Sequence, residues 1–548
     1  MKNCGIMSTN KTKYSMYALI AVLSAIIFCL IYGVRILNPT NTDWLMLGTD
    51  LTQHYLGWRA YRESAWGVPI GMIDGLCYPD QISVIFTDSI PLLAVPFKLI
   101  SGVLPAEFQY FGFWGLLCYI LQGVMAARIL EKYMKNRAVL VMASLLFAFV
   151  PVVLQRMYYH SALAGQWILL YGMETLFAED KSDRKRYQTV FFMALLSASV
   201  HMYLVLMSGM ILLAICMKDY LANRRFRHTI IMLIEYLVVA ATVIAMLGGF
   251  SSTVQSTNEG LGEYALNLNG FINPHDAQGR GARILPDLPI LCLWADEGYV
   301  YLGAGFLFLA GVAIIAVLFN PSVHSRVREH RYTAITVAVL FVISILFALS
   351  PRIGLGSHLL LEVPLPGLVC RLWSVFRATG RVAWIAMYLV MIGSIILLFQ
   401  LKRKRVVAGC MACALLLQIY DLSGILVAKH TKFSQPQVYE SALQQEKIWT
   451  DIAEQPEIKH IVYEADFNIF EMFYFTDYAL DHGMTTSDFY FARSNEESVA
   501  IYRQSVLENA PEDTVFVFGK EGRALCEQYH LYCYETKNYI VGYAKALE

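Results

Sequence analysis

Residues 16–37 read MYALIAVLSAIIFCLIYGVRIL, an apolar run with a single cation close to its end. A hydrocarbon core about 30 Å thick is crossed by about 20 helical residues, so this run is long enough to span it. No small-residue cleavage signal follows, and we expect an uncleaved signal anchor. Of the 548 residues, 57% are hydrophobic and 16% are charged, against roughly 25% charged in a soluble domain. With a mean hydropathy of +0.48, the sequence predicts an α-helical polytopic membrane protein.

Ten further apolar runs follow the first. The stretch 188–217 is too long for one ordinary span, and we expect two helices that turn near His201. The stretch 89–104 is expected to be a juxtamembrane or re-entrant helix, since a crossing there would export the cations that follow residue 131. About eleven transmembrane helices are predicted, at residues 16–37, 108–130, 138–154, 162–178, 188–200, 203–217, 229–249, 299–319, 332–349, 382–400 and 406–427.

The distribution of cations predicts the orientation. With the N-terminus in the cytoplasm, the inner loops hold 21 Lys and Arg in 59 residues, and the outer loops hold 10 in 158. This asymmetry follows the positive-inside rule, so the C-terminal residues are expected outside the cytoplasm. The formal net charge is zero, which implies no bulk attraction to nucleic acid. The helix middles are nearly free of charge, which disfavours an ion-coupled transporter.

The composition becomes that of a soluble domain after about residue 428. We expect a transmembrane domain over 1–427, with its first external loop at 38–107, and a small extracytoplasmic α/β domain over 428–548. Strands are predicted at 460–463 and 514–518, and helices at 495–509 and 521–529. Cys526 and Cys533 form either a bridge or a pair of free thiols. The many aromatic residues of this domain serve either its core or a glycan acceptor.

The first external loop carries five aspartates among many aromatic residues, and one reading is simply a solvated loop in an interfacial belt. Asp50 is set apart because a carboxylate just beyond a helix end can act as a general base at a cavity mouth. Asp88 is the second carboxylate of interest. His54 and Arg59, from the same run as Asp50, are candidate substrate-binding residues.

The other external loops bring cations to the same predicted side. Arg371, Arg377 and Arg381 could clamp a lipid phosphate, because guanidinium groups bind phosphate in a planar fork. The alternative is that they meet ordinary lipid headgroups. Glu297 and His201 complete the candidate substrate-binding set, and Arg156 and His160 are predicted at the same face.

These residues carry a resemblance to an uncharacterised bacterial family of polytopic membrane proteins, which is in turn similar to the GT-C superfamily of membrane glycosyltransferases. The resemblance covers roughly residues 15–430. Its motifs are the run Gly48 to Arg62, Tyr78-Pro79, residues 86–91, Asn273-Pro274, Glu297-Gly298-Tyr299 and residues 376–381.

The resemblance implies an activity at the outer face of the bacterial cytoplasmic membrane. GT-C enzymes transfer a sugar from a polyprenyl-phosphate donor, usually with inversion, so the implied partners are that donor, an envelope glycan acceptor and the bilayer. Asp50 becomes the candidate base, and Arg377 and Arg381 stabilise the phosphate leaving group, with His201 or Arg371 as further candidates. Asp88 is a partner base or, with Asp50, a ligand for a divalent metal such as Mg or Mn. The chain departs from the better-known pattern because it lacks a clear acidic pair in the first loop.

A second class of function fits the same composition. The protein could bind or flip polyprenyl lipids, or scaffold an envelope-assembly complex, without catalysis. Replacing Asp50 by Asn separates the two classes, because only an enzyme should lose transfer while keeping its fold and its donor binding.

Overall fold

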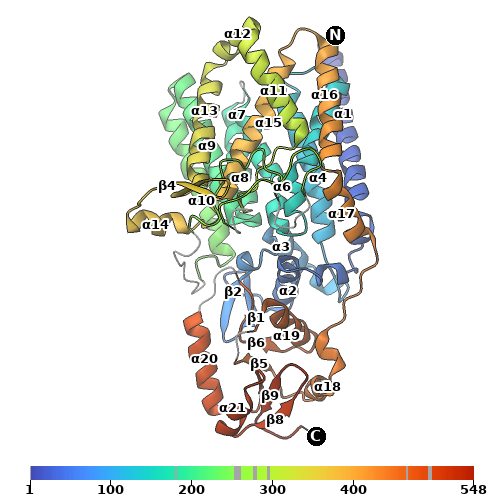
Figure 1. The fold of residues 1–548 in the computed structure, drawn as a ribbon, viewed down its shortest axis with the longest axis vertical. Coiled ribbons are helices and arrows are strands. Elements are labelled where there is room, and N and C mark those ends of the chain that lie inside the picture. The colour runs from blue at the N-terminus through green and yellow to red at the C-terminus, as the bar shows by residue number, and fades with distance from the viewer. Residues whose placement is uncertain are drawn as a thin grey trace. The chain divides into compact units, whose positions relative to one another are not determined.

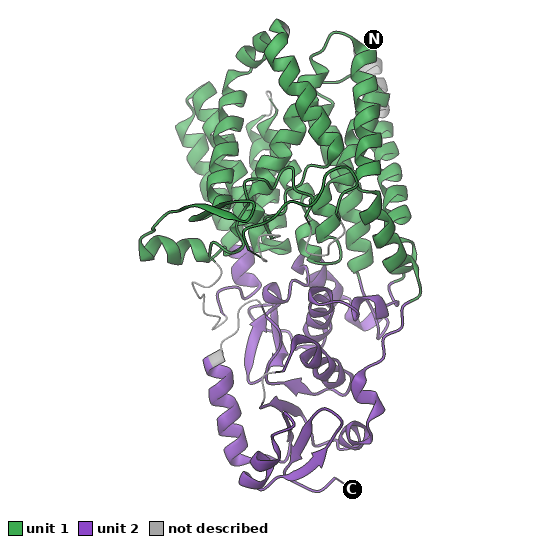
Figure 2. Ribbon diagram, viewed as in Figure 1, with its two compact units in different colours: residues 1–38, 110–241, 257–436 green, residues 39–109, 242–256, 437–548 purple. Residues whose placement is uncertain are grey.

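The computed structural model describes residues 2–178, 182–251, 261–275, 281–292, 297–464, 467–491 and 496–547 (Figure 1). Contacts divide the chain into two compact units (Figure 2). Unit 1 comprises residues 1–38, 110–241 and 257–436, and unit 2 comprises residues 39–109, 242–256 and 437–548. This division differs from the domain limits expected from the sequence, because nearly all of the first external loop groups with the C-terminal residues.

Unit 1 is built almost entirely of helices. Each of the eleven apolar runs contains helical residues. The helices of unit 1 are α1 (Lys2–Tyr32), α4 (Phe111–Leu130), α5 (Arg137–Leu146), α6 (Pro151–Arg156), α7 (Trp167–Leu176), α8 (Asp183–Val200), α9 (Met202–Asn223), α10 (Phe226–Met246, whose last turn belongs to unit 2), α11 (Ala304–Phe319), α12 (Pro321–Glu329), α13 (Arg331–Leu349), α14 (Gly367–Ser374), α15 (Ala383–Phe399), α16 (Lys404–Asp421) and α17 (Ser423–Ser434); α12 and α14 lie outside the predicted runs.

Fewer than eleven of these segments qualify as spans. Among the described residues, six helices are long and apolar enough to cross a membrane, or up to eight if each of two bent pairs is one span. The expected run 138–154 is interrupted, because α5 ends at Leu146 and Pro151 begins the short helix α6. The run 162–178 contains only the ten-residue helix α7. The structure therefore supports a multi-pass membrane protein with six to eight candidate spans.

The turn expected near His201 is confirmed. Helix α8 ends at Val200 and α9 begins at Met202, with His201 between them in an extended conformation. The Nδ1 atom of His201 accepts a hydrogen bond from the backbone N–H of Tyr203 at 3.1 Å. The imidazole thus caps α9 by satisfying one of its orphan donors.

Polar groups on α16 hold the start of α11. Asp421 is fully buried, and its Oδ2 accepts hydrogen bonds from the Tyr301 hydroxyl at 2.7 Å and from the Ala304 N–H at 3.0 Å. Gln418 accepts from the Gly305 N–H at 2.9 Å and donates to the carbonyl of Phe149 at 2.9 Å. Asp421 therefore has a structural role at the N-terminus of α11.

Unit 2 combines the first external loop with a mixed sheet. The loop supplies α2 (Asp50–Glu63), the antiparallel hairpin of β1 (Met72–Cys77) and β2 (Asp80–Ser83), and α3 (Pro91–Leu99). The five-stranded sheet has the order β6-β5-β7-β9-β8, with β5 parallel to both of its neighbours. Its elements are β5 (His460–Tyr463), β6 (Thr485–Thr486), β7 (Thr514–Phe518), β8 (Tyr532–Glu535), β9 (Ile540–Tyr543), α18 (Lys447–Ala453), α19 (Ile469–Asp481), α20 (Glu496–Asn509) and α21 (Arg523–Gln528).

Strands β5 and β7 coincide with the two predicted strands. Along β7, Val515 and Val517 face one buried cluster and Phe516 and Phe518 face the other, as the two-residue period of a strand requires. Both faces of the sheet are thus covered. Cys526, which is buried, and Cys533, which is exposed, are free thiols.

The hairpin of the first loop packs on the C-terminal sheet within unit 2. The Tyr78 N–H donates to the carbonyl of Thr486 at 2.9 Å, and the Tyr78 ring stacks on His460 with centroids 4.0 Å apart. The side-chain amide of Gln53 donates to the carbonyl of Tyr490 at 2.7 Å. These bonds explain why the loop and the C-terminal residues form one compact unit.

Candidate functional site

A strained turn lies against helix α2 in unit 2. Asp88 and Ile90 both have positive φ, 51° and 54°. Aspartate tolerates this left-handed region, but a β-branched residue there is an outlier. The turn is anchored by Ser89, whose hydroxyl donates to the carbonyl of His54 at 2.7 Å and shares a 2.8 Å hydrogen bond with the Thr87 hydroxyl. Strain of this kind concentrates at functional sites, which makes the turn a candidate.

Gly57 lets the turn approach the helix. A Cβ atom on Gly57 would lie 2.4 Å from the Cβ of Thr87 and 2.8 Å from the Oγ of Ser89. A side chain at position 57 would force Thr87 and Ser89 to shift. The motif around Gly48 to Arg62 and the motif at residues 86–91 are therefore two halves of one packed element.

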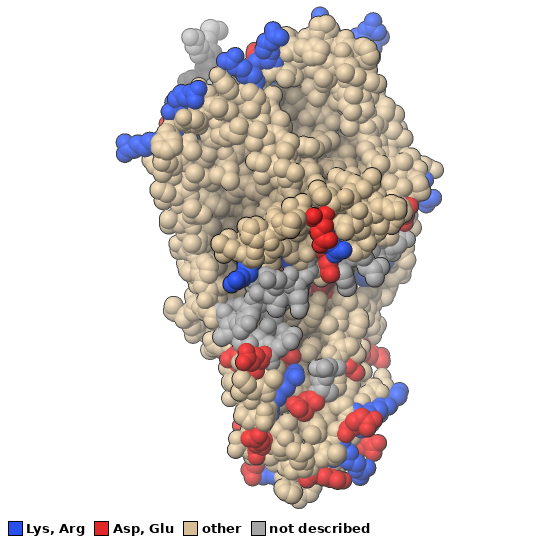
Figure 3. All heavy atoms as spheres, turned by 60° about the vertical axis from the view of Figure 1, so that its left-hand side comes forward, with Lys and Arg blue, Asp and Glu red and all other residues tan. Residues whose placement is uncertain are grey.

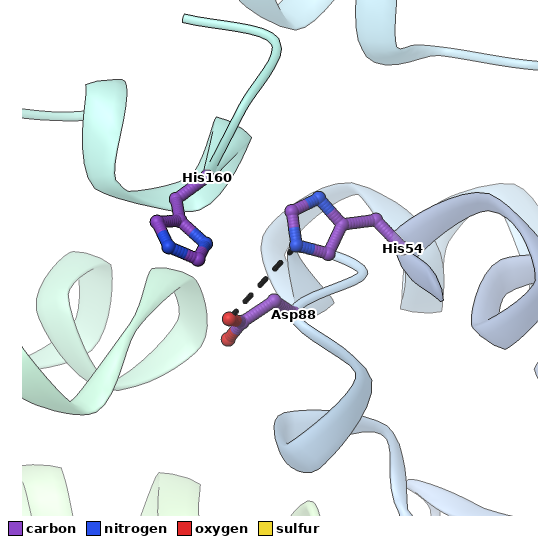
Figure 4. Close-up of side chains that lie close together, drawn as sticks. All are labelled: His54, Asp88 and His160. Atoms are coloured by element: carbon purple, nitrogen blue, oxygen red, sulfur yellow. Dashed lines mark ion pairs between the residues drawn. The ribbon is translucent and has the colours of Figure 1, made fainter. Parts of the chain in front are cut away.

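The turn sets the Asp88 carboxylate beside His54. The Oδ2 of Asp88 lies 4.0 Å from the Nε2 of His54 (Figure 4). The His54 side chain is fully buried, whereas that of Asp88 is 29% exposed. The Asp88 carboxylate thus lies beside the His54 imidazole and is also accessible to solvent.

Asp50 stands one helical turn before His54. It is the first residue of α2 and is buried. Residues four apart share a helix face, and the N-terminus of a helix favours a negative charge. The structure therefore pairs Asp88 with His54 through the turn, and Asp50 precedes His54 by one turn of α2.

Arg59 has a different place from the one expected. Its guanidinium donates to the Oδ1 of Asp477 and to the Oδ1 of Asp481, both at 2.6 Å. The Asp477 side chain is only 9% exposed and that of Asp481 is 46% exposed. These contacts fasten α2 to α19, so Arg59 has a structural part in holding unit 2 together.

In unit 1, one carboxylate collects two buried arginines. Arg156 binds both oxygens of Glu297, at 3.2 Å and 2.7 Å, and the Nε of Arg381 binds Oε2 at 2.9 Å. The Nε2 of His160 lies 3.5 Å from Oε1. Burial alone raises the pKa of Glu297, but the charges of Arg156 and Arg381 outweigh it and hold that pKa well below its ordinary value. Glu297 is accordingly ionised and serves to position cations.

Two glycines bring the segments of this cluster together. A Cβ on Gly380 would lie 2.5 Å from the Cα of Gly298, and the Gly380 N–H donates to the carbonyl of Tyr264 at 2.9 Å. The Nε1 of Trp384 donates to the carbonyl of Tyr299 at 3.2 Å. The motifs at 297–299 and 376–381 are therefore in direct backbone contact.

The two arginines of segment 376–381, Arg377 and Arg381, each lie over a tyrosine ring. The Arg381 guanidinium lies 4.6 Å from the ring centroid of Tyr203, whose hydroxyl accepts from the Ala378 N–H at 2.8 Å. Arg377 lies 5.4 Å from the ring centroid of Tyr264. Within the described residues no carboxylate pairs with Arg377, which is only partly buried. Arg377 is thus available to an outside anion, whereas Arg381 is already paired with Glu297.

His201 and Arg371, the other two predicted substrate-binding residues of unit 1, lie at separate places in the fold. His201 caps α9 two residues before Tyr203 and so helps to place that ring. Arg371 lies on α14 with an exposed side chain, and in the described part of the chain it has no contact with the Glu297 cluster. Sequence reasoning missed the roles of Tyr203 and Tyr264, since an aromatic residue near a membrane surface is usually explained by the interfacial belt.

The helix-rich unit and its candidate spans define a polytopic membrane protein. Its structure is similar to that of the arabinofuranosyltransferase AftD from Mycobacteria, with a TM-score of 0.50 and 14% identity over 92% of this chain and 35% of that one. It also matches the oligosaccharyltransferase AglB from Archaeoglobus fulgidus (TM-score 0.48, 12% identity, 97% and 74% of the two chains) and ArnT from Cupriavidus metallidurans bound to undecaprenyl phosphate (0.44, 12%, 98% and 98%).

The sequence itself places the chain in a family. Residues 21–423 match the model described as Domain of unknown function (DUF6311), and residues 448–544 match the DUF6311 C-terminal domain. The chain belongs to the DUF6311 family. No functionally curated protein matches it.

Proposed function

We propose that this protein is a membrane glycosyltransferase that transfers a sugar from a polyprenyl-phosphate donor to an envelope glycan or polymer at the outer face of the bacterial cytoplasmic membrane. The observation that carries the proposal is the pair of His54 and Asp88, which a strained turn brings together in unit 2, with Asp50 one helical turn before His54 on α2. The GT-C-like fold supports it, because the similar AftD is an arabinofuranosyltransferase.

In the proposed reaction Asp50 is the general base. Its carboxylate takes the proton of the acceptor hydroxyl while the hydroxyl oxygen forms a bond to the anomeric carbon of the sugar. The bond from that carbon to the phosphate oxygen breaks on the opposite face, and its electron pair leaves with the polyprenyl phosphate. Attack opposite the leaving group inverts the anomeric centre.

Arg377 is proposed to receive the leaving phosphate. Guanidinium and phosphate form charge-assisted, bidentate hydrogen bonds, and positive charge stabilises the anion that develops. Arg377 suits this role because it is partly exposed and stacked on Tyr264, whereas Arg381 already pairs with Glu297. We assign Arg381, His201 and Glu297 to positioning within unit 1.

Asp88 is proposed as a partner of the base or as a metal ligand. The buried His54 beside Asp88 would add a nitrogen ligand, which suits Mn²⁺ better than Mg²⁺, because Mg²⁺ prefers an all-oxygen set. A metal held there would supply positive charge to the reacting phosphate. Without a metal, the turn at residues 87–90 keeps the Asp88 carboxylate beside the buried His54 imidazole.

The test replaces Asp50 by Asn in cells that lack the native copy, with Asp43→Asn as the matched control. Asp43 is also the first residue of a helical turn in the same loop (Asp43–Leu45). Loss of a general base lowers the rate about 10²- to 10⁴-fold, so Asp50→Asn should abolish envelope glycan modification, measured by mass spectrometry, while Asp43→Asn retains it.

Donor binding completes the test. Purified Asp50→Asn protein should keep its thermal midpoint and its stabilisation by added polyprenyl phosphate. Full glycan modification by Asp50→Asn would exclude Asp50 as the base. Unchanged modification by every variant of Asp50, His54 and Asp88 would favour a lipid-binding, flipping or scaffold protein.

A further inference from the structure

Unit 1 contains a large cavity beside the C-terminal half of α15, whereas Arg381 precedes the N-terminus of that helix. Its volume is about 880 Å³, within the usual range of ligand pockets of about 300 to 1,000 Å³. Helices α13 and α15 form two of its walls, and residues of α12 and the segments that follow α4 and α7 surround its mouth.

The lining residues of the cavity are mostly apolar and recur at helical spacing along α13 and α15. On α15 the lining residues Val390, Gly393, Leu397 and Gln400 follow each other at three- and four-residue spacing and are all half-buried, on a helix that is otherwise mostly buried. Residues at this spacing form one stripe of a helix. A facing stripe on α13 comprises Ala334, Val337, Ala338 and Phe341. The cavity is therefore a groove between two apolar helix faces.

Gly393 marks the open space inside this groove. A Cβ atom on Gly393 would meet no heavy atom within 4 Å. By contrast, Gly303 and Gly305 of the same unit would bring a Cβ within 2.2 Å of a neighbour. The position is thus free of packing atoms, and a chain could lie along it.

The mouth of the groove is polar and carries cations. Lys132, Arg326 and His330 line it together with Glu174 and Glu329. Glu174 is shared by two cations, Lys132 at 3.9 Å and Arg128 at 2.8 Å. The pair of Arg326 with Glu329 is exposed, 57% and 58%, and exposed pairs are weak, so Arg326 can turn to another anion at little cost.

Glu174 and Glu329 balance the lining cations Lys132 and Arg326, so the excess of positive charge at the mouth comes from the surrounding loops. The mouth is bordered by segments 131–137, 320–331 and 401–405, which the positive-inside rule assigns to the cytoplasmic surface. Figure 3 shows Lys and Arg gathered over the upper end of the molecule, where α12 lies in Figure 1. An apolar groove below a cationic rim is complementary to a lipid with an anionic headgroup.

We propose that this groove binds one anionic phospholipid of the cytoplasmic leaflet. Its phosphate lies at the mouth beside Arg326 and Lys132, and one acyl chain lies along Gly393 between α13 and α15. The site is separate from the proposed transfer reaction and its test uses no transferase activity. Neutral phospholipids have similar acyl chains but lack the net negative charge that the cationic rim of the groove attracts.

The experiment measures lipid retention by native mass spectrometry on the purified full-length chain, titrated with phosphatidylglycerol, phosphatidylcholine or undecaprenyl phosphate. The wild-type chain should retain one phosphatidylglycerol in preference to the other two. Gly393→Phe fills the groove and should lower that retention at least tenfold. Gly311→Phe is the control, since Gly311 lies on α11 with open space around it and does not line the groove. Arg326→Gln should lower the preference for phosphatidylglycerol over phosphatidylcholine about fivefold.

A second variant guards against misfolding. Ala338→Trp fills the groove from α13, at an exposed position, and should act as Gly393→Phe does. Undiminished retention in a folded Gly393→Phe or Ala338→Trp protein overturns the site. Equal retention of phosphatidylcholine overturns the selection by charge, and a preference for undecaprenyl phosphate overturns the phospholipid as occupant.

Discussion

Gly380 and Gly298 touch through their backbones, because a Cβ on Gly380 would lie 2.5 Å from the Cα of Gly298. This contact joins the segment that carries Arg377 and Arg381 to the segment that carries Glu297. The ion pair between Arg381 and Glu297 depends on it, since the two residues are 84 positions apart in the chain. The glycines therefore belong to the framework of the cation cluster.

Replacing Gly380 by Ala is expected to destabilise the protein. Overpacking of a close contact costs about 1–3 kcal/mol, and here the neighbouring atom is backbone, which cannot turn aside. Thermal unfolding in detergent should show a lower midpoint. The matched change is Gly409→Ala on α16, where a Cβ meets nothing within 4 Å, and it should leave the midpoint unchanged or raise it slightly. Equal midpoints for both variants would show that the Gly298 contact is not tight.

Glu297→Gln should be strongly destabilising, by about 3–5 kcal/mol, because it leaves Arg156 and Arg381 buried without their counter-charge. Denaturant unfolding at pH 7 measures the loss. Glu263→Gln, an exposed change in the same unit, should stay within about 0.5 kcal/mol of the wild type.

The same pair predicts a pH dependence. The pKa of Glu297 is held below its ordinary value by Arg156 and Arg381 against the effect of burial. Its ionic contribution to stability is therefore fully present above the unfolded-state pKa of about 4.3, and is lost as pH falls through the lowered folded-state pKa. The stability difference between wild type and Glu297→Gln should shrink as pH falls below about 4.3. A difference that stays constant down to pH 3 would contradict the ionised pair.

Arg377→Gln should lower kcat/KM about 10- to 150-fold. A hydrogen bond to a charged group contributes about 1.5–3 kcal/mol, which corresponds to that range. Arg331→Gln is a close control, because Arg331 also lies over a tyrosine ring, that of Tyr332 at 4.9 Å, but at the other end of α13 from the Glu297 cluster. Sugar transfer from a polyprenyl-phosphate donor is the measurement. Similar losses in the two variants would point to a general effect on the fold.

Gly57→Ala should reduce transfer without altering any reacting group. The added methyl meets Thr87 and Ser89, so the turn that carries Asp88 must shift. Displacements near 1 Å cost about 10²-fold in rate when geometry matters. We expect kcat to fall with KM nearly unchanged. Gly75→Ala on β1 of the same unit meets nothing within 4 Å and should behave as the wild type. Full activity in Gly57→Ala would remove Asp88 from the proposed site.

Hydropathy and the distribution of cations were enough to predict a helical, multi-pass membrane protein, because bilayer thickness and surface charge act on local stretches of chain. The turn at His201 and the strands β5 and β7 were also predictable, since length and residue alternation are local signals. The predicted number of about eleven spans is not confirmed, because Pro151 breaks the run 138–154 and helices α5 and α7 are short. Local hydropathy does not report how far a helix continues.

The sequence by itself determined the class of protein and named Asp50, Asp88 and the arginines as candidates. The tertiary structure alone decided which of them have partners: Ser89 reaches the carbonyl of His54 across 35 positions, and Arg156 reaches Glu297 across 141. It also gave Arg59 a partner in Asp477, 418 positions away. No periodicity encodes such contacts, because they depend on close backbone approach at glycines and on the burial of charge against charge.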